Sequence, residues 1–146
     1  MFRGSAPAKI DDKGRLKVPT GFRRSLEERY GRDVFITSVV GDSVLVYPLA
    51  VWEVHEQRLA ALPSTDRTKR HYLERVSYFG QQGTLDKQGR VVVPQLLRDR
   101  AEMNAEVVVS GRLDHLEVWN LERLQKRFDD QPFTDEDFEY LAERGI

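Results

Sequence analysis

The sequence predicts an α+β fold, rich in β-strands, in which two tandem units interleave into one closed, pseudo-symmetric β-barrel with flanking helices. The first observation is an internal repeat: residues 10–19 read IDDKGRLKVP and residues 85–94 read LDKQGRVVVP, at a constant offset of 75 positions. The second is a series of short β-branched runs bounded by glycine turns, which indicate strands. The third is size, because one such unit is too small to bury its apolar face alone. Two copies that interleave their strands would remove the exposed edges.

Each unit is expected to contain the same elements in the same order. A short strand ends at Asp11, a turn at Gly14 reverses the chain, and the returning strand stops at Pro19, which suits the first turn of a helix. A strand hairpin and a closing helix follow that first helix. The ranges are 34–38, 44–47 and 49–62 in the first unit, and 107–110, 116–119 and 120–128 in the second.

The chain therefore divides into four expected segments. They are a first repeat at 8–60, a helical connector at 61–82, a second repeat at 83–128 and an acidic C-terminal tail at 129–146. The connector opens with a helix-start signal at 63–66. The tail is expected to form a short helix that is capped by Thr134, with Phe138 and Leu141 facing inward.

Composition and charge narrow the classes of function. The absence of cysteine excludes a disulfide framework and a thiolate metal site. No stretch resembles a secretory leader or approaches the ~20 apolar residues of a membrane span, so a soluble, cytoplasmic protein is expected. The net charge is −1, yet residues 1–32 carry nine basic and four acidic residues, and residues 128–146 carry seven acidic residues and one arginine. This asymmetry is typical of a polyanion binder with an acidic tail, although two solvated ends would look the same.

The pattern Asp-x-x-x-Arg occurs twice, at Asp11 and Arg15 and at Asp86 and Arg90. Across a glycine turn, the carboxylate can hold the guanidinium and aim it at a phosphate or at the O6/N7 edge of guanine. A turn device, in which the aspartate shapes the turn and the arginine neutralises it, is the alternative. Two copies in basic surroundings favour double-stranded DNA as the partner.

Further basic residues flank the two motifs and are expected to contact phosphates, which adds affinity without reading sequence. The first copy is richer in them than the second, so the two units are expected to contribute unequally to DNA binding. The candidate DNA-binding residues are Asp11, Lys13, Arg15, Lys17, Asp86, Lys87 and Arg90.

The start MFRG, the segments DDKGRLKVP and DKQGRVVVP, and YPLAVWE at 47–53 together resemble the MraZ family of the AbrB/SpoVT swapped-hairpin group. The resemblance covers essentially the whole chain. It implies a sequence-specific DNA-binding transcriptional regulator that acts as a ring-like homo-oligomer associated with the nucleoid. It also implies short direct repeats as the target, in the promoter of the division and cell-wall gene cluster that includes the regulator's own gene. The residues that match the family motif are Asp11, Arg15, Asp86 and Arg90.

No pattern points to catalysis. The sequence has no phosphate-binding loop, nucleophile elbow or metalloprotease signature, and His55, His71 and His115 lie far apart without metal-ligand spacing. We therefore expect no enzyme activity, no cofactor, no metal and no small-molecule substrate. Two alternatives stay open: an oligomeric protein-interaction scaffold, and an AbrB-fold antitoxin-like regulator. A full second repeat in place of a disordered toxin-covering tail disfavours the antitoxin.

Overall fold

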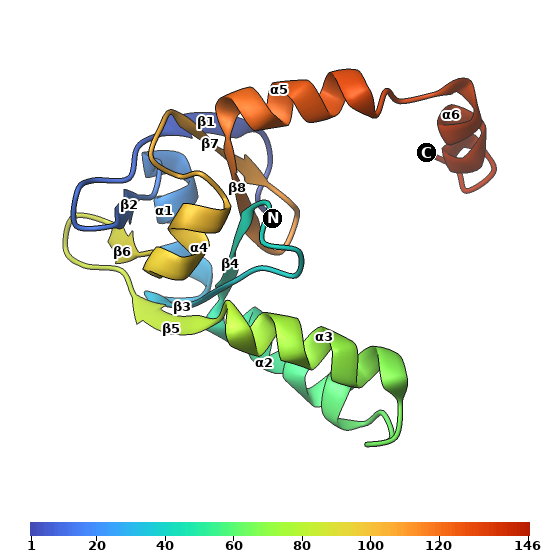
Figure 1. Cartoon of the computed structure of the whole chain (residues 1–146), viewed down its shortest axis with the longest axis horizontal. Coiled ribbons are helices and arrows are strands. Elements are labelled where there is room, and N and C mark those ends of the chain that lie inside the picture. Colours follow the sequence, from blue (N-terminus) through green and yellow to red (C-terminus); the bar gives the residue numbers. More distant parts are fainter.

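The computed structural model describes all 146 residues as two sheets and six helices. A six-stranded antiparallel sheet has the order β1-β7-β8-β4-β3-β5, and a two-stranded ribbon pairs β2 with β6 (Figure 1). The strands are β1 Ser5–Ala8, β2 Arg15–Lys17, β3 Asp33–Thr37, β4 Val44–Pro48, β5 Gln81–Thr84, β6 Arg90–Val92, β7 Val107–Gly111 and β8 Leu116–Asn120. The helices are α1 Thr20–Arg29, α2 Leu49–Ala60, α3 Arg67–Tyr78, α4 Gln95–Arg100, α5 Leu121–Asp130 and α6 Asp135–Ala142.

Both sheets combine strands of the two repeats. β1 of the first repeat pairs with β7 of the second, β5 of the second pairs with β3 of the first, and β4 pairs with β8 at the centre. The ribbon joins the two motif-bearing strands to each other, with Leu16 directly opposite Val91. The predicted interleaving of the two copies is therefore confirmed.

The prediction of a closed barrel is wrong. β1 and β5 are the two edges of the six-stranded sheet, and the β2–β6 ribbon is a separate sheet. Both edge strands are only four residues long, and β1 contains Pro7, which has no N–H to offer a further strand. Short edges and an edge proline limit unwanted pairing without closure of the sheet.

One hydrophobic core draws on both repeats. Nineteen buried side chains form a single cluster between the sheet, the ribbon and helices α1 and α4. Leu16 and Val93 from the ribbon and Leu26 and Leu97 from the two helices are at most 1% exposed. The apolar faces of both units meet in this one cluster, so the main core is shared between the two repeats.

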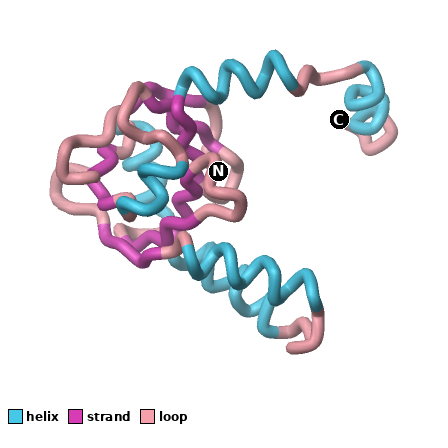
Figure 2. The backbone as a smooth tube through the Cα atoms, in the orientation of Figure 1, coloured by secondary structure: helices cyan, strands magenta, loops and turns pink.

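Two helical extensions leave the body on the same side (Figure 2). The α2–α3 hairpin is anchored at its base by Trp52, which stacks on Phe35 with ring centroids 4.7 Å apart, and by Thr37, whose hydroxyl donates to the carbonyl of Val76 at 2.7 Å. The α5–α6 arm is attached through the buried Leu124 near the start of α5. The helix predicted in the tail is present, but Phe138 is 62% exposed, so the expectation that it faces inward is wrong. None of the helices combines the length and the apolar character needed to cross a bilayer.

Candidate nucleic-acid interface

In the first repeat, the turn between β1 and β2 is built around a single carboxylate. Asp11 Oδ1 accepts hydrogen bonds from the backbone N–H of Lys13 at 3.0 Å and of Arg15 at 2.9 Å. Asp11 Oδ2 accepts from Arg15 Nε at 2.8 Å. Gly14 has φ +79°, which a residue with a Cβ rarely adopts. One oxygen of Asp11 therefore closes the turn while the other aims the guanidinium.

The second repeat reproduces this arrangement. Asp86 Oδ1 accepts from the backbone N–H of Gln88 at 2.8 Å and of Arg90 at 2.9 Å, and Asp86 Oδ2 accepts from Arg90 Nε at 3.0 Å. Gly89 occupies the glycine position with φ +74°. No other hydrogen bond within the chain engages the guanidinium of Arg15 or Arg90. The two terminal amino groups of each arginine therefore lack a partner.

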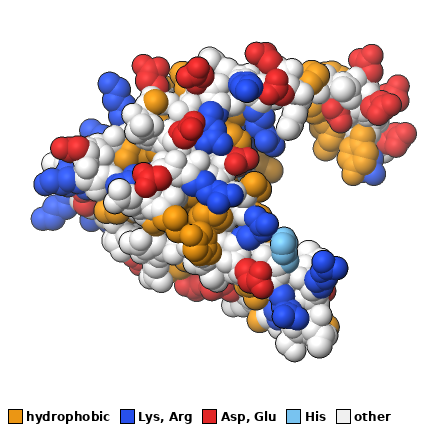
Figure 3. Space-filling model, in the orientation of Figure 1, with side chains coloured by type: hydrophobic (Ala, Val, Ile, Leu, Met, Phe, Trp, Pro, Cys, Tyr) orange, Lys and Arg blue, Asp and Glu red, His pale blue; other side chains and the backbone are white.

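The ribbon brings the two motifs to one end of the molecule. Arg15 pairs with Val92, Lys17 pairs with Arg90, and the backbone N–H groups of Val18 and Val93 donate to the carbonyls of Gly89 and Gly14. Leu16 and Val91 point into the core, so the neighbouring residues of each strand lie on the outer face. Figure 3 shows lysine and arginine side chains gathered at this end of the body.

The structure therefore places all seven predicted residues on the two adjacent hairpins. The two hairpins differ in charge. Lys13 and Lys17 are exposed on the first hairpin, and Gln88 and Val92 occupy the same repeat positions on the second. Lys87 is exposed at the tip of the second hairpin, where the first hairpin has Asp12. The first hairpin is the more basic of the two.

Two arginines that were not among the predicted site residues complete the hairpins. Arg98 of α4 lies over Gly14 of the first hairpin, and Arg23 of α1 lies over Gly89 of the second; a Cβ on either glycine would collide with the arginine. Each hairpin is thus covered by a side chain from the other repeat. The available signal was the repeat itself, since Arg23 and Arg98 also occur at the offset of 75.

The two arginines differ in their partners. Arg23 donates to the Lys87 carbonyl at 2.8 Å and to Glu27 at 3.2 Å, so its guanidinium ties α1 to the second hairpin. The guanidinium of Arg98 makes no hydrogen bond and no ion pair within the chain, although its side chain is half-buried. Of the two covering arginines, only Arg98, over the first hairpin, therefore has a guanidinium without a partner.

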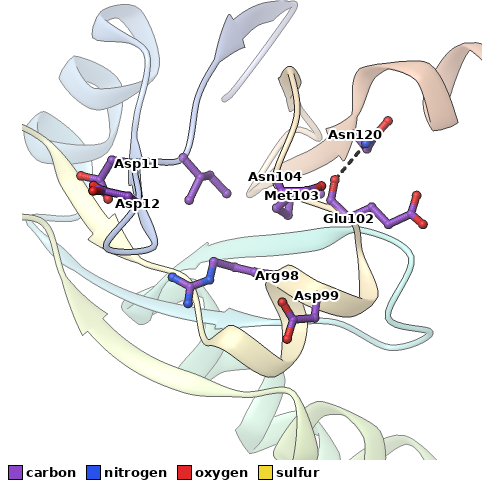
Figure 4. A pocket seen from close by; sticks show the side chains of 9 residues that line it. Asp11, Asp12, Arg98, Asp99, Glu102, Met103, Asn104 and Asn120 are labelled. Carbon is purple, nitrogen blue, oxygen red and sulfur yellow. Dashed lines mark hydrogen bonds between the residues drawn. The ribbon is translucent and has the colours of Figure 1, made fainter.

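A hollow of about 550 Å³ beside the first hairpin does not fit a polyanion (Figure 4). Its walls carry four carboxylates against one arginine: Asp11, Asp12, Asp99, Glu102 and Arg98. The Asn120 amide donates to the Glu102 carbonyl at 2.8 Å across one wall. No group of three or more metal-ligating side chains converges there or elsewhere. The nucleic-acid candidate is therefore the outer face of the ribbon.

The structure also places two of the histidines together, which their distance in sequence did not predict. His115 Nδ1 lies 2.7 Å from Asp114 Oδ1, and His55 Nε2 lies 3.7 Å from Asp114 Oδ2. The His115 ring stacks on Tyr47, and burial raises the pKa of that phenol to about 12. These contacts join α2 to the β7–β8 turn and involve no residue of the β2–β6 ribbon.

The carboxylates of the two motifs are held in their ionised form. The backbone N–H of Arg15 is the main cause that lowers the pKa of Asp11, and the backbone N–H of Arg90 does the same for Asp86. A lowered pKa in the folded state adds stability above the ordinary aspartate pKa of about 4, and this stability is lost as the pH falls through the folded value.

We therefore expect the melting temperature of the double variant Asp11→Asn, Asp86→Asn to fall less than that of the wild type when the pH is lowered below about 4. Thermal denaturation by circular dichroism from pH 6 to pH 3 measures this. The charge-matched control is Asp12→Asn, Asp130→Asn, because both side chains are exposed and make no hydrogen bond. Identical acid slopes for the double variant and this control would contradict the expectation.

Comparison with known proteins identifies the family of the chain. The family model described as "MraZ protein, putative antitoxin-like" matches residues 1–75 and 80–145. A protein of Acidobacterium capsulatum named "Transcriptional regulator MraZ" is 45% identical over 146 residues, with all of both chains covered. Proteins with the same name from Koribacter versatilis and Pediococcus pentosaceus are 46% and 33% identical, over 100% of this chain and 100% and 97% of their own lengths. The chain therefore belongs to the MraZ family, in which these relatives are named as transcriptional regulators.

Proposed function

We propose that this chain is a sequence-specific regulator of transcription that binds double-stranded DNA through the outer face of the β2–β6 ribbon. The observation that carries the proposal is the pair of arginines, Arg15 and Arg90, each held by an aspartate through Nε with its terminal amino groups without a partner. The names of the relatives as transcriptional regulators support the same role. The proposed site is the set predicted from the sequence, with Arg98 added.

A two-stranded ribbon suits the major groove, which is about 12 Å wide and admits one. A guanidinium that is already oriented loses little rotamer entropy when it donates two parallel hydrogen bonds to guanine O6 and N7. Arg15 and Arg90 are therefore the proposed base-reading side chains. Lys13, Lys17 and Lys87 are the proposed phosphate contacts, which set the position and the affinity.

The first hairpin is proposed to contribute more of the electrostatic affinity. It carries Lys13, Lys17 and the partnerless Arg98, whereas the second carries Lys87, and its Arg23 is engaged with Glu27. An unengaged cation releases a condensed counterion when it meets a phosphate, while one in an ion pair gains less. The two hairpins would then dock with the same geometry and unequal strength.

We infer further that several copies act together. The hairpins of one chain offer few contacts, so tight binding requires repeated engagement of repeated sites. The proposed target is a set of short direct repeats in the promoter of the division and cell-wall gene cluster, which includes the regulator's own gene. Repeated sites would be bound by a homo-oligomer. A promoter on the chromosome would place that homo-oligomer in the cytoplasm, associated with the nucleoid. The four segments 8–60, 61–82, 83–128 and 129–146 are retained as the proposed domain organisation.

The test is fluorescence anisotropy with labelled DNA from upstream of the protein's own gene. We expect tighter binding to native DNA with several repeats than to one repeat, and tighter binding to either than to scrambled DNA of the same length. Equal affinity for native and scrambled DNA, by a folded and oligomeric protein, would favour the interaction scaffold instead. Binding to one repeat as tight as to several would contradict the joint action of several copies.

Removing a phosphate contact is expected to change the salt dependence of binding and to leave the sequence preference intact. Lys17→Ala or Arg98→Ala should each reduce the slope of log K against log salt by about 0.9 for each hairpin that engages DNA, because one counterion fewer is released. Anisotropy titrations at several salt concentrations measure the slope. Lys126→Ala, an exposed position on α5, is the matched control with an unchanged slope. A lost preference for native over scrambled DNA in Lys17→Ala would contradict its role as a phosphate contact.

A further inference from the structure

The α6 segment is a complete helix whose apolar side chains remain largely exposed. Thr134 and Asp137 form a reciprocal capping box at its start, and Phe133 packs against Phe138 with ring centroids 4.8 Å apart. Gly145, with φ +80°, ends it in an αL turn. Local signals therefore specify the helix at both ends.

Local signals do not account for its aromatic residues. Phe133, Phe138 and Tyr140 are 59%, 62% and 57% exposed, and every residue of α6 is exposed except Leu141, which is half-buried. Helices shorter than about 12–15 residues are marginal in water without a packed face. Phe138 and Tyr140 are two positions apart and lie on opposite sides of the helix, and the guanidinium of Arg144 lies over the Tyr140 ring at 3.5 Å. The exposed apolar face of α6 is therefore formed by Phe133, Phe138 and Leu141. An exposed apolar face rimmed by charge is typical of an interaction site. We therefore expect the apolar face of α6 to pack against another surface.

The α2–α3 hairpin offers a surface of matching chemistry. A groove of about 530 Å³ lies between the two helices, with apolar residues Leu59, Leu62 and Tyr72 in its lining. Its lining also carries Arg58 and Lys69 against one carboxylate, Asp66, and α3 as a whole carries four basic residues and one acidic residue. The α6 helix carries four acidic residues and no basic one within its bounds. A groove with apolar residues and an excess of basic side chains is thus complementary to a helix with an apolar face and acidic side chains.

The α5–α6 arm and the α2–α3 hairpin stand at opposite ends of the concave side of a C-shaped molecule (Figures 1 and 3). Apolar side chains of α6 are visible on that concave side, and the arm stands clear of the α2–α3 hairpin. The groove is lined from His55 to Leu62 on one side, which is eight residues, and α6 is eight residues long.

We propose that α6 of one chain docks into the α2–α3 groove of a second copy of this chain. Phe133 and Phe138 cover the apolar residues of the groove, and the acidic side chains of α6 meet Arg58 and Lys69. The contact joins two different surfaces, so it passes from copy to copy until the assembly closes on itself. This inference rests on the proposed joint action of several copies and names the surface that would produce it.

The absence of cysteine allows a direct test by disulfide trapping in the full chain. One variant carries Thr68→Cys at the groove and the other carries Ala142→Cys on α6; both positions are exposed. After the two are mixed and oxidised, we expect a covalent product of twice the 17.0 kDa chain mass. The control pair, Thr68→Cys with Glu28→Cys on α1, should give none. A bridge formed only within a single chain that carries both Thr68→Cys and Ala142→Cys would overturn the proposal in favour of docking in cis.

A second measurement separates this contact from DNA binding. Phe138→Ser is expected to weaken self-association about tenfold or more in light scattering across a dilution series, as loss of a buried aromatic anchor does. Phe128→Ser on α5, where the side chain is 61% exposed, is the matched control and should leave association unchanged. Equal losses in both variants, or none in either, would overturn the assignment to α6. Affinity for a single DNA repeat should be the same in Phe138→Ser as in the wild type, so loss of the docking contact is distinguishable from failure of the proposed DNA-binding function.

Discussion

The double variant Arg15→Ala, Arg90→Ala is expected to lose its preference for native over scrambled DNA. Each lost bidentate contact should cost about 1–3 kcal/mol of discrimination, and an assembly that engages several repeats loses the contact at every one of them. The fold should survive, because Asp11 and Asp86 still accept the backbone N–H groups that close the two turns. Anisotropy with both DNAs, together with a thermal melt, measures the two effects separately.

Two further variants make this result specific. Arg15→Lys, Arg90→Lys keeps the charge and removes the planar fork, so it should retain non-specific affinity and lose the preference for native DNA. Lys126→Ala removes one exposed charge on α5 and should change neither. A native preference that persists in the folded alanine variant would place base reading elsewhere. A large fall in melting temperature would instead support the purely structural role of the Asp-x-x-x-Arg motif.

Leu16→Ala is expected to have the largest effect on stability. Leu16 is 0% exposed and lies opposite Val91 beneath the ribbon, where the two repeats meet. Truncation of a buried leucine leaves a cavity and costs about 2–5 kcal/mol, which is a large part of the total stability of a domain. Urea unfolding should show a lower midpoint at an unchanged slope.

The matched control for Leu16→Ala lies on the other face of the same ribbon. Val92 is 46% exposed, and Val92→Ala should change the free energy of unfolding by no more than about 0.5 kcal/mol. Equal effects of the two substitutions would contradict the assignment of the inner and outer faces. In the absence of urea, where Leu16→Ala remains folded, its DNA affinity should equal that of the wild type, because the outer face of the β2–β6 ribbon keeps all of its cations.

The motif turns were predictable because their determinants lie within five residues. Asp11 accepts from the N–H groups of Lys13 and Arg15, and Gly14 supplies the positive φ. The five residues of the pattern D-x-x-G-R are therefore enough to specify the turn. The pairing of the two copies was predictable for a different reason. A repeat at a fixed offset that cannot bury its apolar face alone requires a second copy, and the chain contains one.

Other features depend on contacts between residues that are distant in the chain. Arg98 covers Gly14, and His55 approaches Asp114, only because the two repeats interleave. The edges of the sheet, at β1 and β5, likewise depend on which strands pair, and the apolar spacing within a strand does not encode its neighbour.

The residues of this chain alone therefore determined the repeat, the two aspartate-held arginines, the basic first hairpin and the capped acidic helix, because each is a matter of local hydrogen bonding, turn chemistry or composition. Only the tertiary structure decided that the sheet stays open and that each hairpin is covered by an arginine of the other repeat. The tertiary structure also decided that the apolar face of α6 is exposed to solvent. Burial is a property of the whole packed chain. A sequence pattern shows which face of α6 is apolar, and the fold decides whether anything in the same chain lies against it.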